Sequence, residues 1–194
     1  MTRTRAPAGL VVVVVAAVVL IVGVGGGQSS HRRASGPFAW LHPVSPPTSW
    51  SVARTAGGAT LAYPPGWRRI RTDPGTASVA QLGGGGRIDG YLNATPKQGT
   101  ETLANWTRFR PDHNREEGDR SVRLDASSSD MPFRAGRASC VIDTYTTSKA
   151  TYREIACLVS GRRSSAVVVV AAPIELWNHQ AGTLKRAVSS FIVT

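Results

Sequence analysis

The stretch Cys140–Cys157, CVIDTYTTSKATYREIAC, contains the only two cysteines of this 194-residue chain. Bulky and polar residues alternate on both sides of a polar centre, a pattern typical of a β-hairpin. With the turn at Ser148–Lys149, residues at equal distances from the turn face each other, and the cysteines form such a pair. As a non-hydrogen-bonded pair their Cα atoms would lie about 4.5 Å apart. We therefore predict a Cys140–Cys157 disulfide, with two buried free thiols in adjacent strands as the alternative.

The same register predicts which residues face each other across the hairpin. It sets Asp143 opposite Glu154, an unfavourable pair of like charges that nearby arginines could relieve. A slip of one residue would send every side chain to the other face of the sheet, so the register is well specified. The other predicted facing pairs are Ile142 with Ile155, Thr144 with Arg153 and Tyr145 with Tyr152.

An uncharged hydrophobic run, LVVVVVAAVVLIVGV, extends from residue 10 to residue 24, and Arg3 and Arg5 precede it. It is shorter than the roughly 20 residues of a membrane span and at the upper end of the about 7–15 residues of a signal-peptide core. Residues 10–27 are thus expected to be a signal anchor or a signal peptide, with residues 1–9 in the cytoplasm. An anchored chain would be a single-pass protein of the cell membrane with its C-terminal domain outside. A cleaved chain would be secreted.

The predicted disulfide agrees with export, because disulfides persist in oxidising compartments. The net charge is +11, and nearly all the basic residues are arginines. They are scattered and often adjoin acids, as in HNREEGDR at 113–120, whereas a nucleic-acid-binding surface clusters basic and aromatic side chains. We expect no nucleic-acid partner. The basic surface is either simply solvated or attracted to an anionic membrane or cell-wall polymer.

Residues 28–57 are rich in Ser, Pro, Gly and Ala, a composition that favours an extended tether. Trp40 and Trp50 are unusual in such a segment, and would dock on the domain or lie at the membrane interface. The folded domain is expected at 58–194.

Within that domain, alternation and helical spacing predict an order of strands, one helix, strands and a last helix. Few helices among runs of strands favour an α+β fold with an antiparallel sheet flanked by helices. The first helix is expected from the N-cap Thr100 to just before Pro111, and the last over 176–193. Strands are predicted at 59–63, 78–82, 87–96, 122–127, 128–147 with a turn at Ala135–Gly136, 151–161 and 164–174, and the glycines 83–86 form a hairpin tip.

Three segments resemble known proteins: LAYPPGW at 61–67, RIDGYLNATP at 87–96 and the closing hairpin and helix over 152–193. Together they resemble the PsbP-like families, which include actinobacterial LpqN-type lipoproteins and the extrinsic PsbP subunit of photosystem II. The resemblance covers about residues 58–194. It implies an α-β-α sandwich with an extracytoplasmic accessory or binding role and no catalytic residues. The chain lacks a lipidation cysteine, so any anchor would be the N-terminal segment itself.

No catalytic signature accompanies this pattern. The chain contains no G-x-S-x-G elbow and no H-E-x-x-H metal motif, and its histidines, His31, His42, His113 and His179, are far apart in the sequence. We expect neither an enzyme nor a metal or cofactor site.

The sequence therefore predicts a membrane-tethered extracytoplasmic binding or accessory domain, acting on an unknown protein or lipid partner at the cell envelope. An exported hydrolase with an atypical active site is the alternative. Trp67, Tyr145 and Tyr152 are the candidate ligand or partner contacts. Trp67 could instead be a core residue, and the two tyrosines could simply stabilise the sheet.

Overall fold

The computed structural model describes residues 36–134 and 136–194. The predicted cytoplasmic residues 1–9, the hydrophobic segment 10–27 and the first part of the tether, 28–35, lie outside the described residues, as does Ala135 of the predicted turn. Among the helices that are described, none is long and apolar enough to cross a membrane.

Strands dominate the described chain, and the two α-helices occupy the predicted places in the order. The elements are η1 (Gly36–Phe38), β1 (Ser51–Arg54), β2 (Thr60–Tyr63), β3 (Arg68–Ile70), β4 (Ala77–Leu82), η2 (Gly84–Gly86), β5 (Ile88–Pro96), α1 (Trp106–Glu116), β6 (Arg120–Phe133), β7 (Gly136–Thr146), β8 (Thr151–Ser160), β9 (Ser165–Pro173), η3 (Ile174–Leu176) and α2 (Trp177–Ser190).

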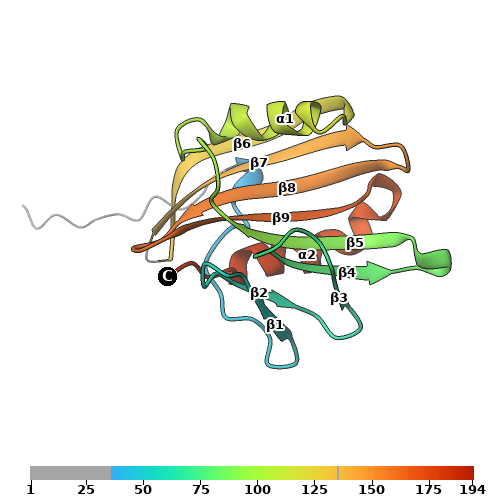
Figure 1. The fold of residues 1–194 in the computed structure, drawn as a ribbon, viewed down its shortest axis with the longest axis horizontal. Helices are drawn as coiled ribbons and strands as arrows, with labels where there is room; N and C mark the ends of the chain where they lie inside the picture. The colour runs from blue at the N-terminus through green and yellow to red at the C-terminus, as the bar shows by residue number, and fades with distance from the viewer. Residues whose placement is uncertain (1–35, 135) are drawn as a thin grey trace, which may run out of the picture. The chain divides into compact units, whose positions relative to one another are not determined.

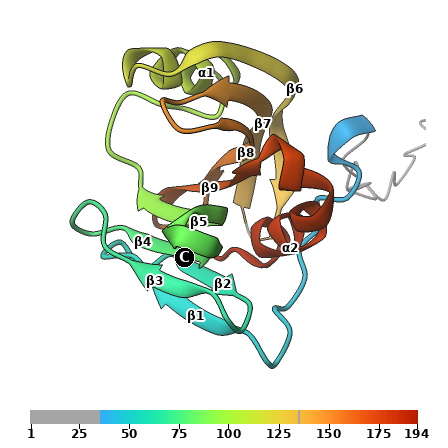
Figure 2. The same cartoon turned by 90° about the vertical axis from the view of Figure 1, so that its right-hand side faces the viewer.

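Seven strands form one antiparallel sheet in the order β3-β4-β5-β9-β8-β7-β6, and β1 and β2 form a separate antiparallel pair. The two helices cover opposite faces of the large sheet, as Figure 2 shows edge-on, and α2 shares its face with the β1–β2 pair (Figure 1). This is the predicted α+β design, an antiparallel sheet flanked by helices.

The β7–β8 hairpin has the predicted register throughout. Cys140 lies opposite Cys157 and Asp143 opposite Glu154. The two cysteine sulfurs are bonded, and their Cα atoms lie 4.1 Å apart. Both cysteines are fully buried, so the disulfide is part of the core rather than an external brace.

The main hydrophobic core lies between the sheet and α2. Side chains from alternate positions of the central strands, such as Leu92 and Val168, meet Leu184 and Val188 of the helix. Ala187 of the helix belongs to the same core, and Phe191 just beyond the helix is also fully buried. This packing explains why α2 runs parallel to the sheet rather than away from it.

The predicted tether is wrong over residues 36–57, because these residues pack on the domain. Phe38 and Leu41 are buried in the main core, and Trp40 and Trp50 pack against it. Residues 51–54 form β1. Isolated apolar side chains between prolines can be buried without regular structure. The overall composition of the segment, rich in Ser, Pro, Gly and Ala, does not reveal such side chains. The folded unit therefore begins well before Gly58.

The first helix also differs from the prediction, at both ends. It begins at Trp106 rather than after Thr100, because Thr102 and Asn105 exchange side-chain and backbone hydrogen bonds in a turn that precedes it. Pro111 does not end it. Proline removes one helical hydrogen bond, but its ring is buried here, and the helix ends before Gly118, whose φ is +93°.

Candidate functional site

The face of the sheet beneath α1 is apolar at one end and polar at the other. At the apolar end, Trp106 packs on Val141 and Ala156, and its indole N–H donates a hydrogen bond to the Ala156 carbonyl at 3.0 Å. Asp143 and Tyr145 lie on the same face of β7, two and four residues after Val141. Period-2 alternation thus sets these polar side chains against the second half of α1.

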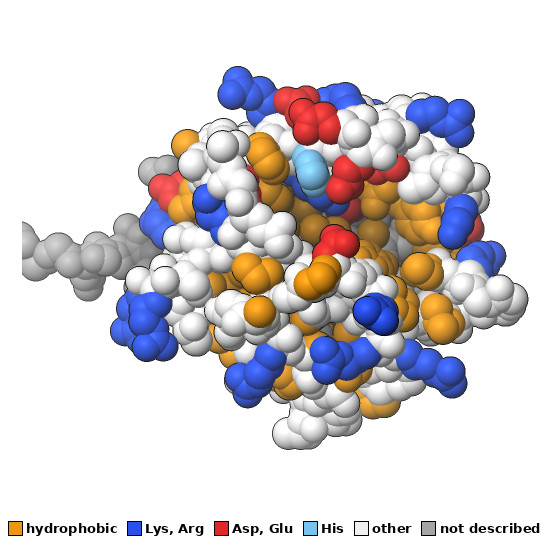
Figure 3. All heavy atoms as spheres, viewed as in Figure 1, with side chains coloured by type: hydrophobic (Ala, Val, Ile, Leu, Met, Phe, Trp, Pro, Cys, Tyr) orange, Lys and Arg blue, Asp and Glu red, His pale blue; other side chains and the backbone are white. Residues whose placement is uncertain are grey.

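A cavity of about 750 Å³ opens beside this helix. Its walls are α1, the neighbouring face of β5, β9, β8 and β7, and the loops at 72–73 and 98–101. Figure 3 shows the hollow below α1, with hydrophobic side chains at its floor and acidic side chains and a histidine at its edge. A volume of this size is in the range of small-molecule sites.

One buried ion pair joins α1 to the sheet at the inner end of the cavity. Arg110 donates from Nε to Glu154 Oε1 at 2.7 Å and from Nη2 to Glu154 Oε2 at 2.9 Å. The Tyr145 hydroxyl donates to the same carboxylate at 3.2 Å. Burial lowers the pKa of Arg110, but the attraction and hydrogen bonds of Glu154 outweigh it, so the net shift is upward and the guanidinium stays charged.

A second buried carboxyl lies directly across the hairpin from the first. Asp143 is fully buried, and its Oδ2 accepts a hydrogen bond from Asn114 Nδ2 at 3.3 Å. Burial and the nearby Glu154 charge raise the pKa of Asp143 to about 8. Asp143 Oδ1 and Asn114 Oδ1 have no partner among the described residues. A protonated Asp143 carboxyl would itself be a hydrogen-bond donor, which the charged form is not.

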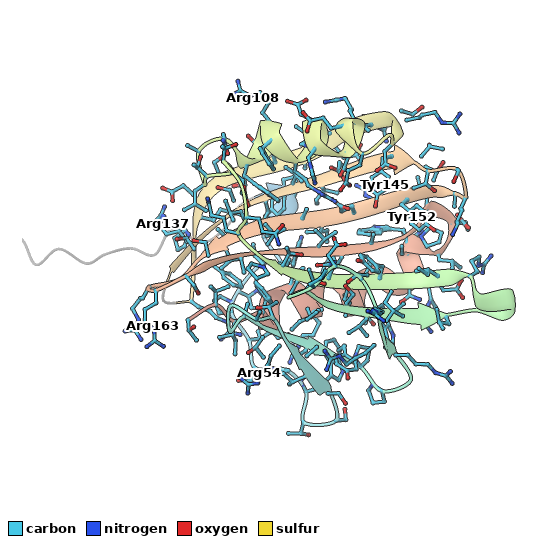
Figure 4. All side chains as sticks on the ribbon, in the orientation of Figure 1. Arg54, Arg108, Arg137, Tyr145, Tyr152 and Arg163 are labelled. Atoms are coloured by element: carbon cyan, nitrogen blue, oxygen red, sulfur yellow. A yellow bond between two sulfur atoms is a disulfide. The ribbon has the colours of Figure 1, made fainter. Side chains whose placement is uncertain are left out.

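The structure separates the three aromatic residues that the sequence indicated. Tyr145 lines the cavity. Tyr152 stacks on it with ring centroids 6.0 Å apart, as Figure 4 shows near the ends of β7 and β8, but does not line the cavity. Trp67 is 8% exposed in the main core and packs against Gly90, where a Cβ would lie 2.5 Å from the indole ring. Trp67 is therefore a core residue.

Sequence reasoning missed the helix residues that complete the site. The predicted Asp143–Glu154 pair raised the question of nearby arginines that could relieve it, and Arg110 pairs with Glu154. Nothing in the sequence selected it from the other arginines, because the orientation of α1 was not known. No feature of the sequence indicated a role for Asn114.

The cavity provides few groups for hydrolytic chemistry. His113 Nε2 lies 3.2 Å from Glu117 Oε1 at its edge, but no serine or cysteine of the described chain lines it. The hydroxyl of Thr95 donates to Asn93, and that of Thr72 is hydrogen-bonded to Thr76 and Ser78, so neither is held by the histidine. Within residues 36–134 and 136–194, no three His, Cys, Asp or Glu side chains gather as metal ligands.

Comparison with known proteins finds likeness in structure only. No protein-family profile matches the chain, and no curated protein matches its sequence. The solution structure of the cyanobacterial PsbP protein CyanoP from Synechocystis sp. PCC 6803 superposes with a TM-score of 0.56 at 16% identity, covering 76% of this chain and 94% of that one. The chain has the PsbP fold.

Two further structures resemble this PsbP-fold chain. A protein of unknown function from Pseudomonas aeruginosa has a TM-score of 0.50 at 14% identity, covering 75% of this chain and 97% of its own. LpqN, involved in cell envelope biogenesis of Mycobacterium tuberculosis, has a TM-score of 0.42 at 10% identity, covering 75% and 90%. The likeness to CyanoP and to the Pseudomonas aeruginosa protein establishes the fold and nothing about ligands.

Proposed function

We propose that this chain is a non-catalytic extracytoplasmic binding domain, held at the cell envelope by its N-terminal segment, whose ligand occupies the cavity beneath α1. The cavity carries the proposal. It is large enough for a small molecule or a partner side chain, and it has both aromatic and polar walls. The buried disulfide supports export, because such bonds persist outside the reducing cytosol.

The interior of the cavity also favours binding over catalysis. Its charged groups at the inner end, Arg110 and Glu154, neutralise each other and are held rigidly between helix and sheet. Rigid, satisfied groups suit a preformed binding site, since little ordering is needed when a ligand enters.

A cavity-filling variant tests the proposal on the full-length protein. Thr95 lines the cavity on β5, and Thr95→Trp would fill part of it. The wild-type protein, purified from native membranes in mild detergent, should retain bound lipids, small molecules or protein partners that mass spectrometry identifies. Thr95→Trp should lose them. Val52→Trp introduces the same side chain at an exposed position of β1 and should retain them. Identical bound molecules in all three proteins would contradict the proposal.

The tether is tested separately by the intact mass of the mature protein. We expect the mature chain to keep residues 10–27 and to resist extraction by high salt or carbonate. A mature chain beginning between residues 25 and 36 would show that the segment is a cleaved signal peptide and the domain is secreted.

A further inference from the structure

The cavity reverses the charge of the rest of the domain. From residue 51 onward the chain has nineteen Lys and Arg and twelve Asp and Glu. Four of those twelve acidic residues line the cavity, but only one of the nineteen basic residues does. The acidic residues are Asp73, Glu101, Glu117 and Glu154. An acidic hollow in a basic surface selects the charge of its ligand by electrostatic complementarity.

The single basic residue of the lining does not cancel this charge. Arg110 is bound at both ends of its guanidinium fork to Glu154. A bidentate pair of this kind is neutral to an incoming ligand. Three carboxylates remain. Among the described residues, only Glu117 of these three has a basic side chain within ion-pair distance, His113.

One buried carboxylate oxygen of a lining residue lacks a hydrogen-bond partner among the described residues. Glu101 is 5% exposed, and its Oε1 accepts a hydrogen bond from the Gln98 backbone N–H at 2.9 Å. Its Oε2 is buried and has no hydrogen-bond partner within the described chain. A buried carboxylate oxygen without a partner costs free energy, and a ligand that donates to it or carries a positive charge would recover that cost.

Aromatic rings form the wall contributed by α1. Trp106, Phe109 and His113 lie on one side of the helix, with centroids 6.0 Å and 5.8 Å apart in two stacked contacts. Tyr91 and Tyr145 add rings from β5 and β7. Aromatic faces beside carboxylates are the combination that binds organic cations, each favourable cation–π contact contributing about 0.5–2 kcal/mol.

We propose that the ligand of this cavity carries an alkylammonium group, which binds among the aromatic rings with Glu101 as its carboxylate partner. This inference rests on the proposed function and names the chemical class of its ligand. The cation is organic because the carboxylates are dispersed around the wall and do not gather as a metal site in the described part of the chain. It comes from a small molecule or from a lysine of a partner protein.

A pair of isosteric probes isolates the charge. Choline and its uncharged isostere 3,3-dimethyl-1-butanol have nearly the same shape. In titrations of the full-length protein in dodecyl maltoside, followed by NMR of the probe methyl resonance, choline should bind at least tenfold more tightly than the isostere. Its affinity should fall as salt rises. Equal affinity for the two probes, or no binding of any ammonium probe, would overturn the proposal.

Matched variants then locate the charge. Glu101→Gln should weaken choline binding about tenfold and leave the isostere unchanged. Glu116→Gln on α1 alters an acidic residue that is 77% exposed and outside the lining, and should change neither. Equal urea midpoints for both variants would show that folding is intact. An equal loss of choline affinity in the two variants would show that Glu101 is not the site.

A third probe distinguishes the two sources of the ammonium group. Preferential binding of N-acetyl-lysine amide over choline would indicate a lysine of a partner protein, and the reverse a small quaternary ammonium compound; both outcomes support the proposal. Failure here is separable from failure of the proposed function. If Thr95→Trp still removes natively bound molecules while no ammonium probe binds, the cavity is a binding site of another specificity.

Discussion

The two faces of the seven-stranded sheet bury their side chains in contrasting ways. The face toward α2 is almost entirely apolar and contains the disulfide. The face toward α1 combines a small apolar cluster with buried charges and a cavity. The contrast runs along single strands, since on β8 the residues Ile155, Cys157 and Val159 belong to the first face, and Glu154, Ala156 and Leu158 to the second. The α2 face is closely packed, whereas the α1 face leaves a cavity beside its buried charges.

The largest effect is expected where a buried charge loses its partner on the α1 face. Arg110→Met leaves the Glu154 carboxylate buried, with the Tyr145 hydroxyl as its only side-chain donor among the described residues. Breaking a buried ion pair in this way costs about 3–5 kcal/mol. Urea unfolding should show a loss of stability of that size.

Two variants serve as controls for that result. Arg108→Met changes an exposed arginine of the same helix, which points away from the sheet in Figure 4, and should have little effect. Arg110→Met combined with Glu154→Met removes both charges and should recover most of the loss, since apolar replacement of a whole buried pair is often neutral. A double variant as unstable as the single one would show that helix packing, not the charge, is responsible.

A somewhat smaller effect is expected on the α2 face from removal of the disulfide. The bond joins residues 17 apart in the sequence, and closure of a loop of this size contributes about 3 kcal/mol. Cys140→Ala combined with Cys157→Ala should lower the free energy of unfolding by roughly that amount while leaving cavity binding unchanged. Alkylation and mass spectrometry of the oxidised wild-type protein should find no free thiol. Two free thiols would disprove the bond.

The α1 face should also make the stability of the protein depend on pH, through Asp143. Burial and Glu154 raise the pKa of Asp143 to about 8, so between about pH 4 and pH 8 the folded state binds more protons than the unfolded state. Stability is therefore highest below about pH 4 for this group, and is lost as the pH rises to about 8. Between pH 5 and pH 7 the loss should be roughly 2–3 kcal/mol. Asp143→Asn should remove this slope in urea titrations, and an unchanged slope would contradict the assignment.

The α2 face could largely be predicted from the sequence, and the α1 face only in part. Strict alternation and a single cysteine pair defined the β7–β8 register, because a slip would have exposed Ile142 and Ile155. The same register predicted the Asp143–Glu154 conflict. It could not identify Arg110, because that contact depends on the rotation of a helix that is distant in the sequence.

The predictions of a tether and of a helix end at Pro111 were wrong for equally specific reasons. Composition predicted a tether where Phe38 and Leu41 are buried, because a few large side chains can be buried from a proline-rich segment. Pro111 was expected to stop a helix that continues through it. The cavity has no sequence signature at all, since it is made by what the sheet and α1 leave unfilled.

The smallest effect concerns two tyrosines that face each other across the hairpin and differ in one hydrogen bond. The Tyr145 hydroxyl donates to Glu154 at 3.2 Å, and burial, with the nearby Glu154 charge, raises the pKa of Tyr145 well above its usual value. Tyr145→Phe keeps the stacked ring but removes this donor from a buried carboxylate. It should cost about 1 kcal/mol.

Tyr152→Phe is the matched control, because it keeps the same ring stack and removes a hydroxyl that is not bonded to the carboxylate cluster. Its free energy of unfolding should stay within a few tenths of a kcal/mol of the wild type, the usual range for a surface change. In the Arg110→Met background, Tyr145→Phe should cost more than in the wild type, since that hydroxyl is then the remaining side-chain donor to Glu154. A cost that is equal in both backgrounds would mean that the tyrosine and the arginine do not stabilise the same charge, and that the polar face is a set of independent contacts rather than one coupled network.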